Sequence, residues 1–201
     1  MRSALALSAL VLLAACGQSG PTVLENEAKD AATAATMQGW DRAFGAPRET
    51  IGRVNQFGYR ATDYAADGPT FLAKGGPITL SQSDAKAPNT GTFEAAGATA
   101  DKIDRLVFTL SLTDAANAET AKKRFVEVLR GFLSQYGIDD EGGFDAITSE
   151  QSADGPIGGA PASIDVTKGA DGRPIITVTF NRPTGTTPVF PDQGQADGNR
   201  A

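Results

Sequence analysis

The side chains that most often carry out chemistry in proteins are scarce in this chain of 201 residues. It contains no histidine, and its one cysteine is Cys16. The absence of histidine removes the usual general base near neutral pH and the commonest metal ligand. Because no further thiol is present, a zinc site built from nitrogen and sulfur ligands is excluded as well. Binding proteins and hydrolases that use only carboxylates remain compatible with this composition.

Carboxylates are densest between residues 139 and 154, a stretch without lysine or arginine. Its acids are Asp139, Asp140, Glu141, Asp145, Glu150 and Asp154. Asp139 and Glu150 stand at the first and twelfth positions of a possible EF-hand calcium loop. However, Phe144 occupies the sixth position, where that loop needs glycine for a sharp turn, and Gly143 supplies no side-chain ligand at the fifth. The pattern therefore favours a solvated acidic loop, and we expect no metal and no cofactor.

Ser83 and Lys86 have the S-x-x-K spacing with which a lysine activates a serine in penicillin-binding enzymes. No Lys-Thr-Gly sequence follows, and Pro88 and Asn89 favour a loop where that site needs the start of a helix. We interpret the spacing as a chance match. The sequence therefore predicts no catalytic residue, and we expect the protein not to be an enzyme.

Cys16 follows an apolar run over residues 4–15 that is broken only by Ser8 and preceded by Arg2. As a helix this run would be roughly 18 Å long, whereas the hydrocarbon core of a bilayer is about 30 Å thick, so the run is too short to span a membrane. A short basic start, a short apolar core and small residues before a processing point are typical of a secretory signal. We therefore assign residues 1–15 to a signal peptide.

The sequence Leu13-Ala14-Ala15-Cys16 resembles the lipobox of bacterial lipoproteins, in which a leucine and two small residues precede the cysteine. The resemblance implies lipidation of Cys16 with diacylglycerol, cleavage before it and often a further acyl chain on the new amino terminus. Each buried methylene contributes about 0.8 kcal/mol, so two or three acyl chains hold a protein on a membrane. Because an aspartate after the cysteine favours inner-membrane retention in enterobacteria, Gly17 implies the outer membrane, facing the periplasm.

Removal of residues 1–15 leaves 17 basic and 24 acidic side chains, hence a net charge of −7. Such a surface repels nucleic acid and anionic headgroups, so we expect no nucleic-acid partner. With Cys16 lipidated, no thiol remains for a disulfide, and the domain must be stabilised by its core. The expected partners are the membrane, through the anchor, and another envelope protein.

The best-patterned part of the chain predicts a strand over residues 103–112 followed by a helix over residues 115–136. In the strand, apolar and more polar residues alternate, which predicts one buried face. Asp114 is a suitable N-cap for the helix, and Gly137 a suitable left-handed C-cap. Glu119 and Lys123 are spaced for an (i, i+4) ion pair. The side chains expected on the wetter face of the helix are Lys122, Lys123, Glu127 and Arg130.

The remaining elements are shorter. After a long loop over residues 139–162, the strands 163–167 and 174–180 are expected to form a hairpin whose turn contains Asp171-Gly172. Two short helices are predicted at 38–44 and 48–56, and short strands, separated by turns that include Gly75-Gly76, at 59–64, 70–74, 77–82 and 91–95. A helix that covers one face of a mostly antiparallel sheet gives a two-layer α+β domain.

The predicted organisation comprises four parts. After the signal peptide, residues 16–36 form a lipidated, flexible tether with a reach of very roughly 25 Å and some helical tendency over 24–36. A single α+β domain covers residues 37–182. A disordered tail rich in proline and glycine follows over residues 183–201.

Two apolar features have alternative interpretations. The aromatic residues of the N-terminal half either line a pocket for an apolar ligand or form the core, and we favour the core because this half has few large aliphatic residues. These residues are Trp40, Phe44, Phe57, Tyr59 and Tyr64. The tail segment 188–194 either binds another protein through Val189 and Phe190 or is unbound, and we favour the unbound tail.

Three functions are compatible with these observations. The leading hypothesis is a lipid-anchored cell-envelope protein that acts in the periplasm by binding or assembly. The second is a carrier of a small apolar molecule, with a cavity between helix 115–136 and the sheet. The third is a hydrolase of cell-wall glycan, which needs two carboxylates about 5 to 10 Å apart. A large open cavity against the helix would favour a carrier over an assembly module with a closed core.

Overall fold

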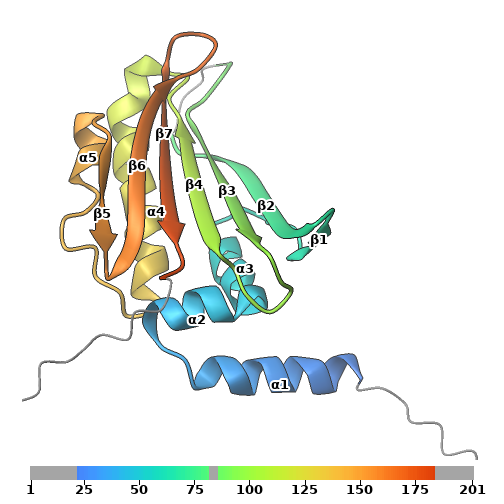
Figure 1. Cartoon of the computed structure of the whole chain (residues 1–201). Coiled ribbons are helices and arrows are strands. Elements are labelled where there is room, and N and C mark those ends of the chain that lie inside the picture. Colours follow the sequence, from blue (N-terminus) through green and yellow to red (C-terminus); the bar gives the residue numbers. More distant parts are fainter. Residues whose placement is uncertain (1–21, 82–85, 184–201) are drawn as a thin grey trace, which may run out of the picture.

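The computed structural model describes residues 22–81 and 86–183 and has the predicted α+β architecture. Seven strands form one antiparallel sheet in the order β1-β2-β3-β4-β7-β6-β5. The strands are β1 (Ala65–Asp67), β2 (Thr70–Thr79), β3 (Thr90–Gly97), β4 (Arg105–Ser111), β5 (Ala153–Ile157), β6 (Ala160–Lys168) and β7 (Pro174–Asn181). The helices are α1 (Val23–Ala35), α2 (Gly39–Gly45), α3 (Pro47–Asn55), α4 (Ala118–Ser134) and α5 (Asp145–Ser149), with a 3-10 turn (Ala115–Asn117) before α4. Figure 1 shows α4 behind the sheet and α2 and α3 across its lower end.

The centre of the sheet is held in register by one row of buried side chains. Phe93 lies opposite Phe108, Phe108 opposite Val178, and Val178 opposite Ile164, so the row crosses β3, β4, β7 and β6. All four side chains are buried. A shift by one residue would turn the whole row to the open face, so this pattern fixes the pairing. The predicted strand 103–112 and the predicted hairpin are confirmed.

Helix α4 covers the buried face of this central part of the sheet. Its inward residues Phe125, Leu129 and Phe132 are fully buried, and the Phe132 ring lies 5.4 Å from that of Phe108. The helix ends as predicted: Gly137 has a φ of 68°, and the amide of Ile138 donates to the carbonyl of Leu133 at 3.1 Å. The carboxylate of Asp114 caps the preceding 3-10 turn by accepting a hydrogen bond from the amide of Ala116 at 3.1 Å.

The predicted long loop over residues 139–162 is wrong, because this stretch contains α5, β5 and the start of β6. Strand β5 lies at the sheet edge and pairs with β6 alone. Its residues Asp154, Gly155 and Pro156 are exposed, so the strand has no apolar alternation that would reveal it in the sequence. Backbone pairing forms this element, and its side chains give no signal of it.

The N-terminal strands also differ from the prediction. Residues 59–64 are not a strand, although the Tyr59 carbonyl accepts a hydrogen bond from the amide of Gly76. The predicted strands 70–74 and 77–82 are joined in β2, and Gly75-Gly76 forms an irregularity in its pairing with β3 where we expected a turn. The predicted helices 38–44 and 48–56 are confirmed as α2 and α3.

Lys122 does not lie on the wet face of α4, contrary to the prediction. It is 3% exposed, and its Nζ lies 2.9 Å from the Glu150 carboxylate and 2.6 Å from that of Glu119. It also donates to the carbonyl of Thr148 at 3.0 Å. The predicted Glu119–Lys123 pair is therefore replaced by a Glu119–Lys122 pair. The reason is the unpredicted α5, whose C-terminal end covers this part of α4.

Helix α1 lies within the segment that we predicted to be a tether. It begins with a capping box, in which the hydroxyl of Thr22 accepts from the amide of Glu25 and the Glu25 carboxylate accepts from the amide of Thr22. An ion pair of 2.6 Å joins Glu27 to Arg48 of α3. The helical tendency of residues 24–36 is confirmed, whereas the flexibility of the tether stays a prediction. In the described ranges, no helix has the length and apolar composition needed to cross a membrane.

A candidate binding groove between α4 and β2

A groove of about 810 Å³ lies where α4 meets the second half of β2. Three segments far apart in the sequence line it: residues 57–60 after α3, residues 76–80 of β2, and Arg124, Glu127 and Val128 of α4. The size falls within the range of about 300 to 1,000 Å³ that is typical of small-molecule sites. We call it the α4–β2 groove.

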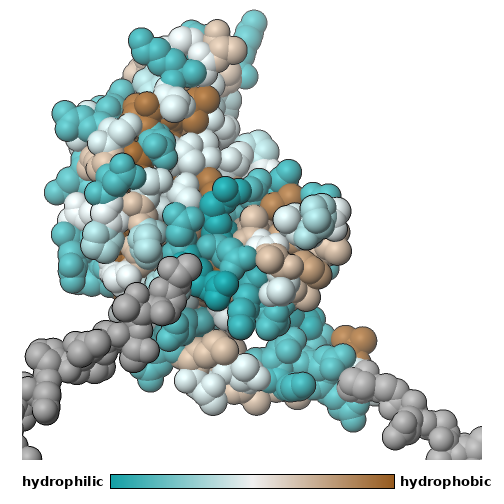
Figure 2. Space-filling model, viewed as in Figure 1, coloured by the Kyte–Doolittle hydropathy of each residue, from teal (hydrophilic) through white to brown (hydrophobic). Residues whose placement is uncertain are grey.

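The surface of the α4–β2 groove is partly apolar. Phe57, Ile78 and Val128 are half-buried and pack against the core, and Tyr59 and Leu80 beneath them are buried. The opposite, open face of the sheet looks different: in Figure 2, hydrophilic and near-neutral residues cover most of it, and hydrophobic residues form separate spots. The groove therefore offers an apolar ligand a concave surface.

Two arginines on different elements line the groove without a counter-ion. Arg60 follows α3 and Arg124 lies on α4, and neither forms an ion pair or side-chain hydrogen bond within the described residues. The other arginines of the described chain all pair with Asp or Glu: Arg42, Arg48, Arg53, Arg105, Arg130, Arg173 and Arg182. The groove thus holds positive charge that the rest of the fold leaves unneutralised.

The backbone of the groove is unusual at three positions. Gly58 has a φ of 89°, Gly76 of 93° and Arg60 of 49°. A Cβ atom at Gly76 would lie 2.7 Å from the carbonyl oxygen of Gly91, so no other residue fits there without a shift. At Arg60, a left-handed conformation is uncommon for a residue with a side chain, and such positions cluster at functional sites. The amide of Gly76 donates to the Tyr59 carbonyl at 2.6 Å and so fixes residues 57–60 against β2.

The hydroxyl of Tyr59 is buried and has no hydrogen-bond partner in the described part of the chain. A Cβ atom at Gly91 would lie 3.2 Å from this hydroxyl and 2.9 Å from Leu80 Cδ1, so Gly91 provides the space in which the Tyr59 ring packs. Burial raises the pKa of Tyr59 well above its ordinary value of 10.0, and the hydroxyl therefore stays neutral. A buried polar group without a partner costs about 1 to 3 kcal/mol.

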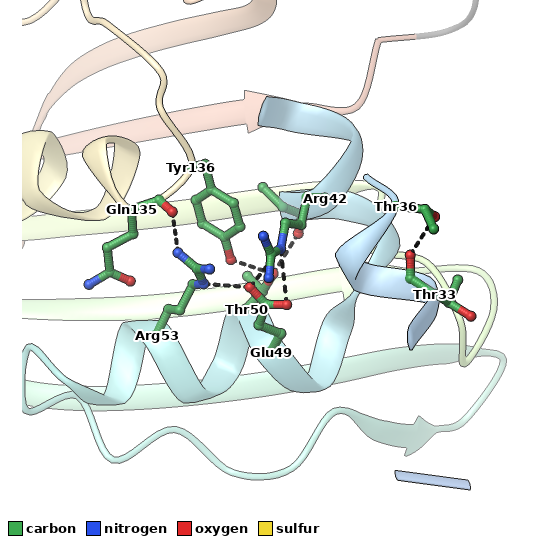
Figure 3. A network of polar contacts seen from close by, with 9 residues as sticks. Thr33, Thr36, Arg42, Glu49, Thr50, Arg53, Gln135 and Tyr136 are labelled. Carbon is green, nitrogen blue, oxygen red and sulfur yellow. Dashed lines mark hydrogen bonds and ion pairs between the residues drawn. The ribbon is translucent and has the colours of Figure 1, made fainter. Parts of the chain in front are cut away.

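A second polar cluster, which joins α3 to α2 and the end of α4, differs from the groove because its members pair with one another (Figure 3). The Glu49 carboxylate bridges Arg42 at 2.9 Å and Arg53 at 2.6 Å. The hydroxyls of Thr50 and Tyr136 share a hydrogen bond of 2.9 Å, and burial raises the pKa of Tyr136 to about 12. This arrangement stabilises the docking of the helices, and within the described residues the buried Oε1 of Gln135 is the atom of this cluster without a hydrogen-bond partner.

The acidic stretch 139–154 does not gather its carboxylates at one point. Asp140 pairs with Arg130 at 3.0 Å, and Glu150 pairs with Lys122. Across residues 22–81 and 86–183 there is no group of three or more histidine, cysteine, aspartate or glutamate side chains that could hold a metal ion. Two of the acids therefore serve as partners of cations on α4.

The other candidates are only partly visible in the structure. Cys16, Ser83 and the tail segment 188–194 lie outside the described residues, and Lys86 is exposed. Ser83 and Lys86 therefore remain a sequence pattern without described geometry. The lipidation of Cys16 likewise stays a prediction.

The aromatic residues divide between the two interpretations given above. Trp40, Phe44 and Tyr59 belong to the core, and the Trp40 ring lies 4.9 Å from that of Phe180. Phe57 and Tyr59 also line the groove, whereas the half-buried Tyr64 donates its hydroxyl hydrogen to the Lys102 carbonyl at 2.8 Å. Sequence patterns do not predict that Arg60, Ile78 and Arg124 line one groove, because nothing in their local patterns links them.

The two buried tyrosines allow a matched test of these hydrogen-bond assignments. We expect Tyr59→Phe to leave the free energy of unfolding unchanged or to raise it by up to about 1 kcal/mol, because it removes a hydroxyl without a partner. Tyr136→Phe should lower it by about 1 kcal/mol, because the bond to Thr50 is lost. Urea denaturation of the full chain measures both. Equal losses in the two variants would contradict the assignment for Tyr59.

Comparison with protein-family models, with curated proteins and with solved structures finds no match for this chain. The chemistry of the α4–β2 groove and the sequence pattern around Cys16 are therefore the features that bear on function.

Proposed function

We propose that this protein is a lipid-anchored component of the bacterial cell envelope whose domain binds a small ligand in the α4–β2 groove, without catalysis. The observation that carries the proposal is the groove itself. It is open, it has the size of a small-molecule site, and it places half-buried apolar side chains beside two unpaired arginines. An open site of this kind beside α4 supports binding of a small ligand, as in the carrier hypothesis, over an assembly module with a closed core.

The ionisable groups of the groove support binding in preference to catalysis. They are the two arginines, the carboxylate of Glu127 and the neutral hydroxyl of Tyr59. A glycosidase needs two carboxylates across its cleft, whereas the described residues that line this groove include a single one. Among the described lining residues there is no serine or cysteine nucleophile with a neighbouring base. The three charged groups can attract and orient a ligand.

The proposed location depends on the lipobox-like sequence that ends at Cys16. Acyl chains on Cys16 would attach the domain to the outer membrane, facing the periplasm, through the segment that contains α1. The net charge of −7 after processing is consistent with a domain that approaches the membrane through its anchor and not by attraction to anionic headgroups. A ligand site near a membrane would be well placed for molecules that partition into lipid.

The binding role can be tested with the neutral apolar dye Nile red. We expect its fluorescence to rise in the presence of the full chain, and Val128→Trp to weaken binding about tenfold, because the indole fills the groove next to Phe57 and Ile78. Val107→Trp, on the open face of the sheet, is the matched control and should bind the dye like the wild type. Circular dichroism and thermal unfolding check that both variants are folded. Undiminished binding by Val128→Trp would contradict the proposed site.

The anchor can be tested separately by intact-mass and peptide mass spectrometry of the protein purified from its native host. We expect a mature chain that begins at Cys16 and carries the mass of a diacylglycerol group. Cys16→Ser should abolish that mass and release the protein from the membrane fraction. A mature chain without acyl mass, or one that begins elsewhere, would contradict the anchor and leave the binding groove to be judged by the dye experiment.

A further inference from the structure

We infer that the α4–β2 groove takes a ligand with an apolar chain and one anionic group, such as a free fatty carboxylate. The inference rests on the proposed function and specifies the ligand class of that same site. Three observations carry it: the arginines without an ion-pair partner among the described residues, the apolar side chains that line the same groove, and the one described acid of that lining.

Arg60 and Arg124 are charged groups that the fold does not use internally. All other described arginines form ion pairs at 2.6 to 3.7 Å, so internal pairing is the common state of arginine in this domain. Some lysines also lack an ion-pair partner, but no lysine lines the groove. The guanidinium group presents several donors in a planar fork that matches a carboxylate. Two such forks at one groove therefore favour an anion.

The apolar part of the ligand is specified by the apolar side chains that line the groove together with the arginines. Phe57 lies in the same short segment as Arg60, Val128 lies one turn from Arg124 on α4, and Ile78 comes from β2. Their half-buried side chains can cover an alkyl chain, and each methylene removed from water contributes about 0.8 kcal/mol. An inorganic anion would leave this surface unused, and a neutral hydrocarbon would leave both arginines unused.

Glu127 limits the charge that the ligand can carry. It lines the groove beside Arg124, is exposed, and forms no ion pair within the described residues. The net charge of the lining is therefore +1, from two arginines and one glutamate. A single negative charge is complementary to this lining, whereas each additional one would be repelled by the Glu127 carboxylate. We therefore commit to a monoanionic amphiphile.

Calorimetric titration with decanoate and decan-1-ol, both below their aggregation limits, tests this inference. The full chain carries Cys16→Ser in every sample, so that no acyl chain of its own can compete. We expect decanoate to bind about tenfold more tightly than decan-1-ol at low salt, and this preference to shrink as salt is added. Acetate, which has the charge without the chain, should show no saturable binding.

Variants of the groove charges give effects of opposite sign. Arg60→Gln and Arg124→Gln should each weaken decanoate binding about threefold to tenfold, and Glu127→Gln should strengthen it about twofold, because attraction or repulsion of the carboxylate is removed. Lys123→Gln is the matched control, since it makes the same charge change next to Arg124 but outside the groove. None of these substitutions should alter the affinity for decan-1-ol.

The inference would be overturned by equal affinity for the acid and the alcohol, by arginine variants that behave like Lys123→Gln, or by no binding of decanoate. These outcomes differ from failure of the proposed function. If Nile red still binds and Val128→Trp still blocks it, the groove is a binding site with a different ligand class. If Val128→Trp does not weaken the binding of Nile red, the assignment of the groove as the binding site is wrong.

Discussion

The arrangement of this domain depends on one constraint: a single long helix cannot cover a seven-stranded sheet. The apolar residues of α4 pack on the centre of the sheet, where Phe108 and Phe132 are in contact. The rest of that face must be covered by other segments. Helices α2 and α3 cover one end through Trp40, Phe44 and Ile51, which are buried in the same core. The second half of β2 receives no such cover, and the α4–β2 groove is the result.

Charged side chains differ between the parts of the sheet face that helices cover and the part that they leave open. Where elements pack closely, charges are paired: Lys122 lies between Glu119 and Glu150, and Glu49 joins two arginines at the junction of α2 and α3. At the groove, Arg60 and Arg124 have no such partners within residues 22–81 and 86–183. Unpaired groups beside apolar surface are a familiar property of binding sites, because a ligand supplies the missing contacts.

Sequence periodicity was sufficient to predict the elements that have one apolar, buried face and one more polar face. The alternation around Phe108 and the stripe of α4 predicted a strand and a helix within a few residues of their bounds. It failed where backbone pairing alone forms the element, as in β5, and where glycines permit an irregular strand, as in β2 at Gly75-Gly76. Lys122 was misplaced because the helix that covers it was not predicted.

The groove could not be predicted because it is a property of tertiary contacts. Its three segments are separated by many residues, and the lack of an ion-pair partner for Arg60 or Arg124 within the described residues can be seen only in the folded structure.

The central claim is that this site binds the ligand. The most direct measurement is a ¹H–¹⁵N NMR titration of the full chain with decanoate. The account predicts that the largest shifts fall in residues 57–60, 76–80 and 124–128; shifts centred on the open-face residues Thr92, Thr109 and Thr177, or none, would contradict it.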